Sequence, residues 1–466
     1  MSDSSVKVFD TGGKNVDTES LTVGATTVQR QRMQLAGATA TAIAAVQGTE
    51  VASTSIGLVT RNVPGSTVQN VELVARNVDA FGRIIVAHPE TLFDAKMDHD
   101  NLPLLFDDQQ TSGAGTTSTY NANQASVTLA VGNSTAGTRV RQSFQRLVYQ
   151  AGKGQGSALT GVLGTPASGI TRRIGLFDGE NGLFFESSPT AINVVRRSFV
   201  TGSAVDVAVP QSSWNIDKMD GTGSSGITLD FSKTQIFLIQ YQWLGVGALW
   251  FGFDVGGFAY WAHKISIANI QSVVSMSTPN LPVRYEISNS GAGGAASLLQ
   301  ICSSVWSSGG AEFVGSTRAI YRNAVLTTLN NANWYPALAV RLRATRLGSR
   351  IGIENISLAC QSTSDYTWRL VLNPTVVGTA LSFSELTGSS IEAAVGATNA
   401  TTVTGGIDLH AGVSDAGAGS MTRAGLGIIG LGSTIAGVAD TLVFAVRRDT
   451  GTTESFMATM CLLEQA

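Results

Sequence analysis

Short runs of β-branched and aromatic residues, each ending close to a glycine, constrain the fold of this chain more than any other feature. Apolar and polar side chains alternate within several runs, as at Val127, Leu129 and Val131, which is the period of a strand with one buried face. The 52 glycines among 466 residues come with 10 prolines and without a collagen period, which indicates many tight turns. The sequence therefore predicts a mainly β protein with multiple β-sandwich or jelly-roll-like domains.

Helical signals are few, and the chain divides into three parts by composition. Only SLLQICSSVWSS (297–308) and parts of 386–396 have apolar residues at helical spacing. Residues 1–60 are polar and rich in alanine and threonine, and predict an extended N-terminal segment for attachment or oligomerisation. Residues 61–290 predict a central β-rich region of one or more domains, and 291–466 predict a C-terminal β-sandwich-like domain.

The charge and hydropathy of the chain exclude several classes of partner. Charged residues make up 14% of the chain and the formal net charge is −3, so bulk electrostatics gives no attraction to nucleic acid. The longest uninterrupted apolar run, Trp243 to Phe253, is shorter than the ~20 residues that a membrane-spanning helix needs. The opening MSDSSVKVFD has neither the basic nor the apolar region of a secretory signal. We expect no nucleic-acid partner and no membrane insertion.

Arginine outnumbers lysine by 23 to seven, an imbalance that is typical of subunit interfaces. Arginines two residues apart on a predicted strand place both side chains on one face. Three such pairs are candidate interface residues: Arg30 and Arg32, Arg139 and Arg141, and Arg341 and Arg343. We predict that these strands contact a second copy of the chain or another protein.

Aromatic residues are concentrated between positions 241 and 261. Trp243, Trp250 and Phe251 are candidates for exposed rings that stack on sugars or fill a partner's pocket. The alternative is the aromatic core of a β-sandwich, which the usual burial of large rings favours.

A Gly-x-Gly-x-x-Gly pattern spans Gly221 to Gly226. A dinucleotide site needs this pattern between a buried strand and a helix, so that amides at the helix N-terminus face the pyrophosphate. Here the polar segment WNIDKMD precedes it and a predicted strand, ITLDF, follows it. We interpret the pattern as a hairpin loop and expect no cofactor.

Asp98, His99 and Asp100 form the best candidate metal site, since carboxylates and imidazole ligate divalent ions. Prolines on both sides indicate loops, where acidic residues are solvated or meet arginines, so a structural loop is the favoured interpretation and we expect no metal. The aromatic surroundings of His263 in FAYWAHKISI indicate a packing histidine. The three cysteines follow no zinc or disulfide pattern.

Hydrolytic chemistry has little support in the sequence. Neither an HExxH nor a GxSxG motif occurs, whereas the paired carboxylates of a glycosidase have no local signature. Asp178, Glu180 and Glu186 are close in sequence and are interpreted as turn residues. We expect that the protein is not an enzyme.

Longer motifs resemble virion structural proteins of tailed phages, a group common among environmental and aquatic viruses. The motifs extend over nearly the whole chain: VDTESLTVGATTVQRQRMQ (16–34), GLFDGENGLFFE (175–186), DKMDGTGSSGITLDFSKTQIFLIQYQWLGVG (217–247), STPNLPVRYEI (277–287), LVLNPTVVGTALSF (370–383) and TTVTGGIDL (401–409). The similar proteins place basic residues after LGVG, whereas Ala248, Leu249 and Trp250 follow it here, so this surface is expected to be apolar.

The resemblance implies a structural virion protein that is made in the host cytoplasm and located in the tail, as a fibre, baseplate or tail-tip part. By analogy with phage fibres it implies a homo-oligomer, expected to be a trimer, with other virion proteins as partners and host-surface glycans as a further contact. Two alternatives remain: a decoration or spike protein of the phage head, and a virion-borne carbohydrate-binding or depolymerase protein.

Overall fold

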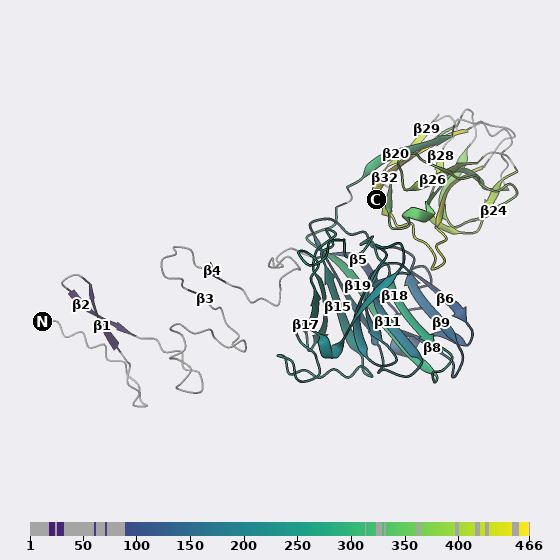
Figure 1. The fold of residues 1–466 in the computed structure, drawn as a ribbon. Helices are drawn as coiled ribbons and strands as arrows, with labels where there is room; N and C mark the ends of the chain where they lie inside the picture. The colour runs from purple at the N-terminus through teal and green to yellow at the C-terminus, as the bar shows by residue number, and fades with distance from the viewer. Residues whose placement is uncertain are drawn as a thin grey trace. The chain divides into compact units, whose positions relative to one another are not determined.

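The computed structural model describes most of the chain after residue 88 and four short segments before it (Figure 1). The described residues are 18–23, 26–31, 60–61, 70–71 and 89–465, with gaps at 313, 323–328, 330–331, 361–364, 397–399, 415–419, 425–427 and 450–455. The chain forms two compact units, Met1–Val74 and Ala75–Ala466, so the N-terminal unit extends past the expected limit at residue 60. Its strands are β1 (Thr18–Val23), β2 (Thr26–Gln31), β3 (Thr60–Arg61) and β4 (Asn70–Val71), paired as β1–β2 and β3–β4.

The second unit begins with a β-sandwich of two antiparallel sheets, which we call the first sandwich. One sheet has eight strands, which in spatial order are β17 (Phe258–Ile265), β16 (Leu249–Val255), β15 (Gln235–Tyr241), β10 (Gly154–Val162), β19 (Ala296–Ser308), β8 (Ser126–Val131) and β7 (Thr116–Asn121), with β5 (Pro89–Lys96) also paired to β19. The other sheet has seven strands: β14 (Val205–Pro210), β13 (Ile192–Ser198), β12 (Gly182–Ser187), β11 (Ile170–Phe177), β18 (Val283–Asn289), β9 (Gly137–Ser143) and β6 (Phe106–Gly113).

Phenylalanine rings from both sheets fill the centre of the first sandwich. The ring centroid of Phe185 on β12 lies 5.1 Å from that of Phe237 on β15, and 5.5 and 5.0 Å from those of Phe251 and Phe253 on β16. All four side chains are fully buried. Alternation along each strand directs these rings inward and leaves the intervening residues on the outer faces of the sheets.

The hairpin between β16 and β17 shows why glycine is needed at the turns. Its two loop residues, Gly256 and Gly257, have φ angles of +64° and +83°. A two-residue loop that matches the twist of the strands requires positive φ at both positions, where side chains with a Cβ are strained.

A second sandwich follows, with its own hydrophobic core. One sheet contains β20 (Ser316–Arg322), β32 (Phe456–Gln465), β22 (Arg350–Cys360) and β29 (Ser420–Ala424), with β30 (Ile428–Ile429) paired to β22. The other contains β25 (Ser384–Glu385), β26 (Ile391–Val395), β21 (Tyr335–Leu342), β31 (Thr441–Arg448), β23 (Tyr366–Leu372) and β28 (Ile407–Ser414), and β24 (Thr375–Val377) pairs separately with β27 (Thr402–Thr404). The prediction of a mainly β fold with multiple sandwiches is confirmed.

The expected domain boundary at residues 290/291 and the expected helices differ from the structure. β19 pairs with β10, β8 and β5, so the first sandwich extends to Ser308. The segment 297–308 is thus a strand, and residues 391–395 of the second expected helix form β26. The helices in the described residues are the short 3₁₀ turns η2 (Ala122–Gln124), η3 (Gln211–Ser213) and η4 (Ala344–Arg346). None of the helices in this part has the length and hydropathy to traverse a bilayer.

Candidate functional site

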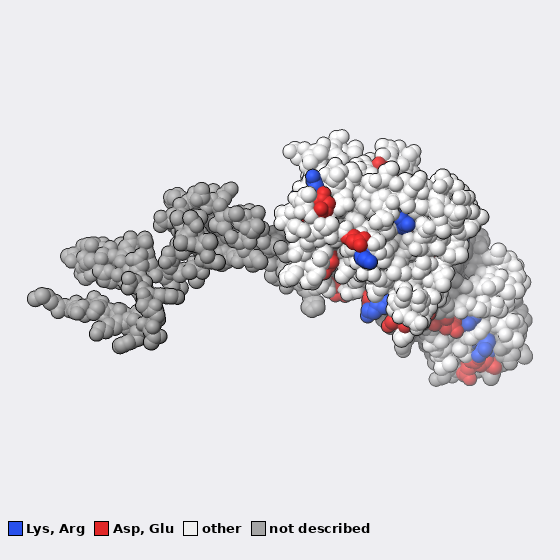
Figure 2. Space-filling view, turned by 90° about the horizontal axis from the view of Figure 1, so that it is seen from below, with Lys and Arg blue, Asp and Glu red and all other residues white. Residues whose placement is uncertain are grey.

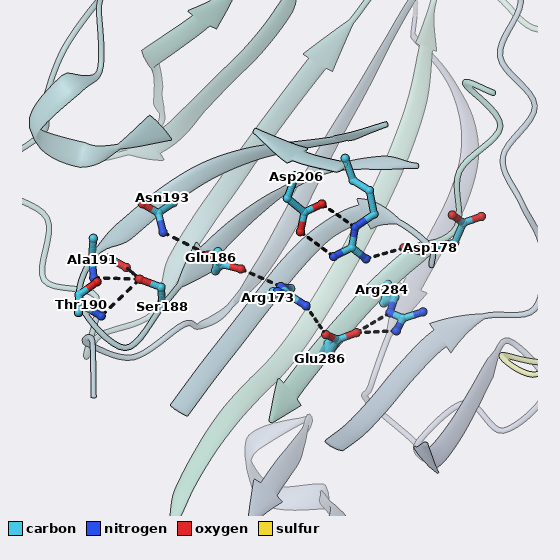
Figure 3. A network of polar contacts seen from close by, with 11 residues as sticks. Arg173, Asp178, Glu186, Ser188, Thr190, Ala191, Asn193, Asp206, Arg284 and Glu286 are labelled. Carbon is cyan, nitrogen blue, oxygen red and sulfur yellow. Dashed lines mark hydrogen bonds and ion pairs between the residues drawn. The ribbon is translucent and has the colours of Figure 1, made fainter. Parts of the chain in front are cut away.

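An arginine–carboxylate network covers part of the outer face of the seven-stranded sheet (Figure 3). Arg173 on β11 lies between Glu186 on β12 and Glu286 on β18, because both carboxylates stand directly across from it in register. The Arg173 Nε donates to Glu186 Oε2 at 2.8 Å, and its Nη1 donates to Glu286 Oε1 at 2.7 Å. One guanidinium therefore joins three neighbouring strands.

Two further arginines extend this network. Arg284 Nε donates to Glu286 Oε2 at 3.0 Å, and Arg197 forms two parallel hydrogen bonds of 2.8 Å to Asp206. Burial alone would raise the pKa of Glu286, but the charges and hydrogen bonds of Arg284 and Arg173 outweigh it, so the pKa lies below the usual glutamate value. The network holds Glu286 as a carboxylate.

Aromatic rings support the guanidinium groups from below. Phe177 and Phe184 are fully buried and their centroids are 4.5 Å apart. The guanidinium carbon of Arg197 lies 5.2 Å from the centroid of Phe184, and that of Arg284 lies 5.2 Å from the centroid of Phe177. These cation–π contacts and the ion pairs fix each arginine in one orientation. The arginines and their carboxylate partners thus form a polar layer over the two rings, in which the charged groups pair with one another.

A row of side chains crosses the outer face of the eight-stranded sheet. Strand register aligns six residues on neighbouring strands: Lys264, Trp250, Gln240, Gly156, Trp306 and Thr91. Residues directly opposite each other in an antiparallel sheet share a face, so the five side chains lie on the outer side, with Gly156 between them. We call this set, together with Trp261, the tryptophan row.

Two tryptophans of this row pack closely on glycines. A Cβ on Gly156 would come within 2.6 Å of Trp306 Cε2, and one on Gly252 within 2.8 Å of Trp261 Cε3. Trp261 also packs edge-on against Trp250 at 5.7 Å, and the Lys264 ammonium lies 4.8 Å above the Trp250 ring. The tryptophan row thus places indole rings and one cation, the Lys264 ammonium, on the outer face of the sheet.

The predicted interface arginines differ from one another in burial and in ion-pair partners. Arg139 and Arg141 share a face, as expected, but both bind Asp108 on the adjacent β6, at 2.6 and 3.2 Å. Arg141 is fully buried and also donates to Gln300 Oε1, so the prediction that it contacts a partner is wrong. The aligned strand pairing that brings Asp108 beside it explains the burial.

The other interface candidates are partly accessible or not described. Arg341 pairs with Glu392 and Arg343 with Glu385, both at 2.7 Å, and 40% and 24% of their side chains are exposed. The side chain of Arg30 on β2 and all of Arg32 lie outside the described residues.

The aromatic candidates divide between core and surface. Phe251 is fully buried, so its prediction as a surface residue is wrong; strand alternation directs it inward beside Trp250. Trp243 is half-buried and donates from Nε1 to the carbonyl of Met276. Trp306 was not a candidate because it lies in the segment predicted as helical. Its place becomes visible only through the register of β19 with β10.

The Gly221–Gly226 segment is a loop, as predicted. Asp220 and Thr228 form a β-bridge across its base. The Asp217 carboxylate fills the loop, accepting hydrogen bonds from the backbone N–H groups of Met219 at 2.8 Å and Ser225 at 2.7 Å. These amides therefore bind the Asp217 carboxylate. In a dinucleotide site, backbone amides of such a loop would bind phosphate instead.

The remaining candidates have structural surroundings. His263 is buried, its Nδ1 accepts from the Asn215 backbone N–H at 3.1 Å, and burial lowers its pKa, which agrees with a packing role. The His99 side chain is 91% exposed, and the described residues contain no group of three metal-ligating side chains. Glu186 is a strand residue, so its interpretation as a turn residue is wrong, whereas Asp178 accepts from Glu180 and Asn181 in a turn.

No protein-family model and no curated protein sequence matches the chain. Similar solved structures include a glycoside hydrolase family protein from Mycobacterium thermorestibile, with a TM-score of 0.33 and 12% identity over 46% of this chain and 99% of that one. A legume lectin-like domain from Entamoeba histolytica has a TM-score of 0.28 and 11% identity over 47% of this chain and 98% of that one. The lectin from Bauhinia forficata in complex with GalNAc has a TM-score of 0.28 and 13% identity, with coverage of 47% and 98%.

Proposed function

We propose that this chain is a non-enzymatic structural protein of a tailed-phage virion, located in the tail, where it assembles as a homo-oligomer and meets other virion proteins. The motif resemblance gives the class of protein. An exposed edge strand in the first sandwich supports a role in assembly.

That edge strand, β14, is the observation on which the proposal rests. β14 is the terminal strand of the seven-stranded sheet, and β13 is its neighbour on one side. Val205 and Val207 on β14 are 47% and 41% exposed. Proteins that stay monomeric shield such edges with lysine, proline or a covering segment, because an open edge recruits another strand. β14 contains no lysine, and its one proline, Pro210, is its last residue. Strand pairing between neighbouring subunits uses this edge.

The surface and the arginine network also support a structural role. On the face in Figure 2, charged residues are few and most stand beside one of opposite charge. Glu186 and Glu286 share Arg173, and the pKa of Glu286 is lowered, whereas the general acid of a glycosidase needs a raised pKa. These carboxylates serve as ion-pair partners that join strands.

Location within the virion tests the proposal directly. Virions carrying an epitope-tagged copy of this chain are labelled with gold-conjugated antibody and imaged by electron microscopy. We expect label on the tail. Label on the head would replace the tail assignment with the decoration or spike alternative, and purified virions without label would refute the proposal. Release of reducing ends from host polysaccharide by the purified protein would refute its non-enzymatic part.

A further inference from the structure

We infer that the tryptophan row of the first sandwich binds a neutral, extended polysaccharide chain. This inference rests on the proposed function, since it names the chemistry of the host surface that a tail protein would meet. Its evidence is separate from the motif resemblance and comes from the geometry of the eight-stranded sheet.

The row offers ring faces at a spacing that suits an extended ligand. Trp250 on β16 and Trp306 on β19 are separated by the strands β15 and β10. With strands about 4.8 Å apart, the backbones of Trp250 and Trp306 are about 14 Å apart along the row, and the Trp306 ring lies over Gly156 on β10, one strand nearer to Trp250. A ligand that contacts both must extend across several strands. A polysaccharide does so with a repeating unit, and the C–H face of each sugar packs on an aromatic ring.

A polar side chain and an unpartnered donor lie along the row. Gln240 stands in register with both Trp250 and Gly156, which places its side-chain amide on the same face of the sheet as the rings. Trp250 Nε1 lacks a hydrogen-bond partner among the described residues. Buried polar groups are normally hydrogen-bonded, because an unmet donor or acceptor costs free energy. Sugar hydroxyls, which both donate and accept, would satisfy the Trp250 donor and bind the Gln240 amide.

Charge distinguishes this ligand from other aromatic-stacking ligands. Lys264 is the cation of the row, and the nearby Lys96 on the same face forms an ion pair with Asp94 at 3.2 Å. Single-stranded nucleic acid also stacks on aromatic rings, but its phosphates require several cations along the groove. A neutral polysaccharide needs no such cations.

Ring orientation distinguishes the ligand from a protein partner. Aromatic anchors of protein interfaces insert into a pocket of the partner. Trp306 and Trp261 instead pack onto Gly156 and Gly252 of their own sheet, where a Cβ would meet the indole atoms at 2.6 and 2.8 Å. Rings held against the sheet, with an amide on the same face, fit a polysaccharide chain that lies along the sheet.

Native affinity electrophoresis of the purified full chain tests the inference, with hydroxyethyl cellulose or glucomannan cast in the gel. We expect at least one of these neutral β-linked polymers to retard the wild type. Trp306→Ala and Trp250→Ala should each weaken binding about tenfold or more, as expected for a central aromatic contact. Gln240→Leu should weaken it as well, while Trp306→Phe, which keeps a ring, should retain most of it.

Phe258→Ala is the matched control, because Phe258 is 58% exposed on β17 of the same sheet but lies outside the row. Its mobility should equal that of the wild type. Circular dichroism of every variant separates loss of binding from loss of folding. No retardation of the wild type, or equal retardation of the wild type and both alanine variants, would overturn the inference. So would a change in oligomer mass in Trp306→Ala, which would make the row a subunit contact.

The two proposals fail in different experiments. Gold label on the tail together with no polysaccharide binding would leave the virion assignment standing and remove the polysaccharide site. Polysaccharide binding that depends on Trp306, in a protein that is absent from virions, would leave the polysaccharide site standing and remove the virion assignment.

Discussion

Trp306 lies so close above Gly156 that a Cβ at position 156 would stand 2.6 Å from the indole Cε2. The two residues face each other on the paired strands β19 and β10. The same relationship joins Trp261 to Gly252 on β17 and β16. These glycines lie in strands, where glycine is normally unfavourable, and the ring on the neighbouring strand covers the exposed backbone.

Gly156→Ala should therefore destabilise the first sandwich. The added methyl group would force the Trp306 ring away from the sheet, and such overpacking typically costs about 1–3 kcal/mol. Urea denaturation followed by tryptophan fluorescence measures the change in the free energy of unfolding. Gly179→Ala is the control, since a Cβ there meets no atom within 4 Å. Equal stability of the two variants would contradict the close packing of Trp306.

The glycine content illustrates what the sequence could and could not predict. It predicted turns, and Gly221, Gly256 and Gly257 do occupy turns with positive φ. The glycines under Trp306 and Trp261 were missed, because their role depends on the register between strands that are distant in sequence. The alternation of polar and apolar residues can be read from the sequence of one strand, whereas register depends on how that strand pairs with a strand distant in sequence.

β19 shows a second limit of the sequence. Leu298, Gln300, Ser303 and Val305 face the core, so the period of two is broken between residues 300 and 303. The register with β10 shifts at the same place, which marks a β-bulge. One extra residue in a strand creates three-residue spacing, and this spacing imitates a helix. The arginine network was missed for the same reason as the glycines, since Arg173, Glu186 and Glu286 meet only through strand pairing.

Replacing Arg173 should destabilise the seven-stranded sheet strongly. Arg173→Met removes the cation shared by two largely buried carboxylates, and breaking a buried ion pair in this way costs about 3 kcal/mol or more. Lys96→Met is the control, because the Lys96–Asp94 pair is solvent-exposed and should change the free energy of unfolding by less than about 0.5 kcal/mol. Urea midpoints of both variants against the wild type provide the measurement.

The lowered pKa of Glu286 predicts a loss of stability in acid. Its pKa in the folded chain lies below that in the unfolded chain, which is about 4.3 for a free glutamate. As the pH falls, the unfolded chain binds the proton first, so the free energy of unfolding decreases from about pH 5 downward. Glu286→Gln removes this contribution and should flatten the decrease relative to the wild type. Urea denaturation at pH 7 and at pH 4 compares the two, and parallel decreases would contradict the role of Glu286.

Asp217 should matter for folding of the loop 221–226. Asp217→Ala leaves the backbone N–H groups of Met219 and Ser225 without an acceptor, at a cost of about 2–3 kcal/mol. Asp220→Ala, in the same loop, removes an exposed aspartate that accepts from Thr222, and should destabilise the chain much less than Asp217→Ala. Thermal unfolding by differential scanning calorimetry ranks the two variants. A larger effect at Asp220 would mean that Asp217 does not organise the loop.

The exposed edge of β14 leads to a prediction about assembly. Lysine on an edge strand opposes the approach of a second strand, because the ammonium group would be desolvated and would face the neighbour's backbone. Val207→Lys should therefore lower the oligomer mass while the chain remains folded. Val207 is 41% exposed, so the substitution removes little packing within the chain.

Light scattering coupled to size-exclusion chromatography measures this effect, with Val413→Lys as the matched control. Val413 is 67% exposed on β28, the edge strand of the six-stranded sheet in the second sandwich. Both variants add one positive charge to an exposed valine at a sheet edge, so any difference between them reports on the position and not on net charge. If only Val207→Lys dissociates the oligomer, then β14 is the assembly edge. An unchanged mass in Val207→Lys would show that subunits associate through another surface.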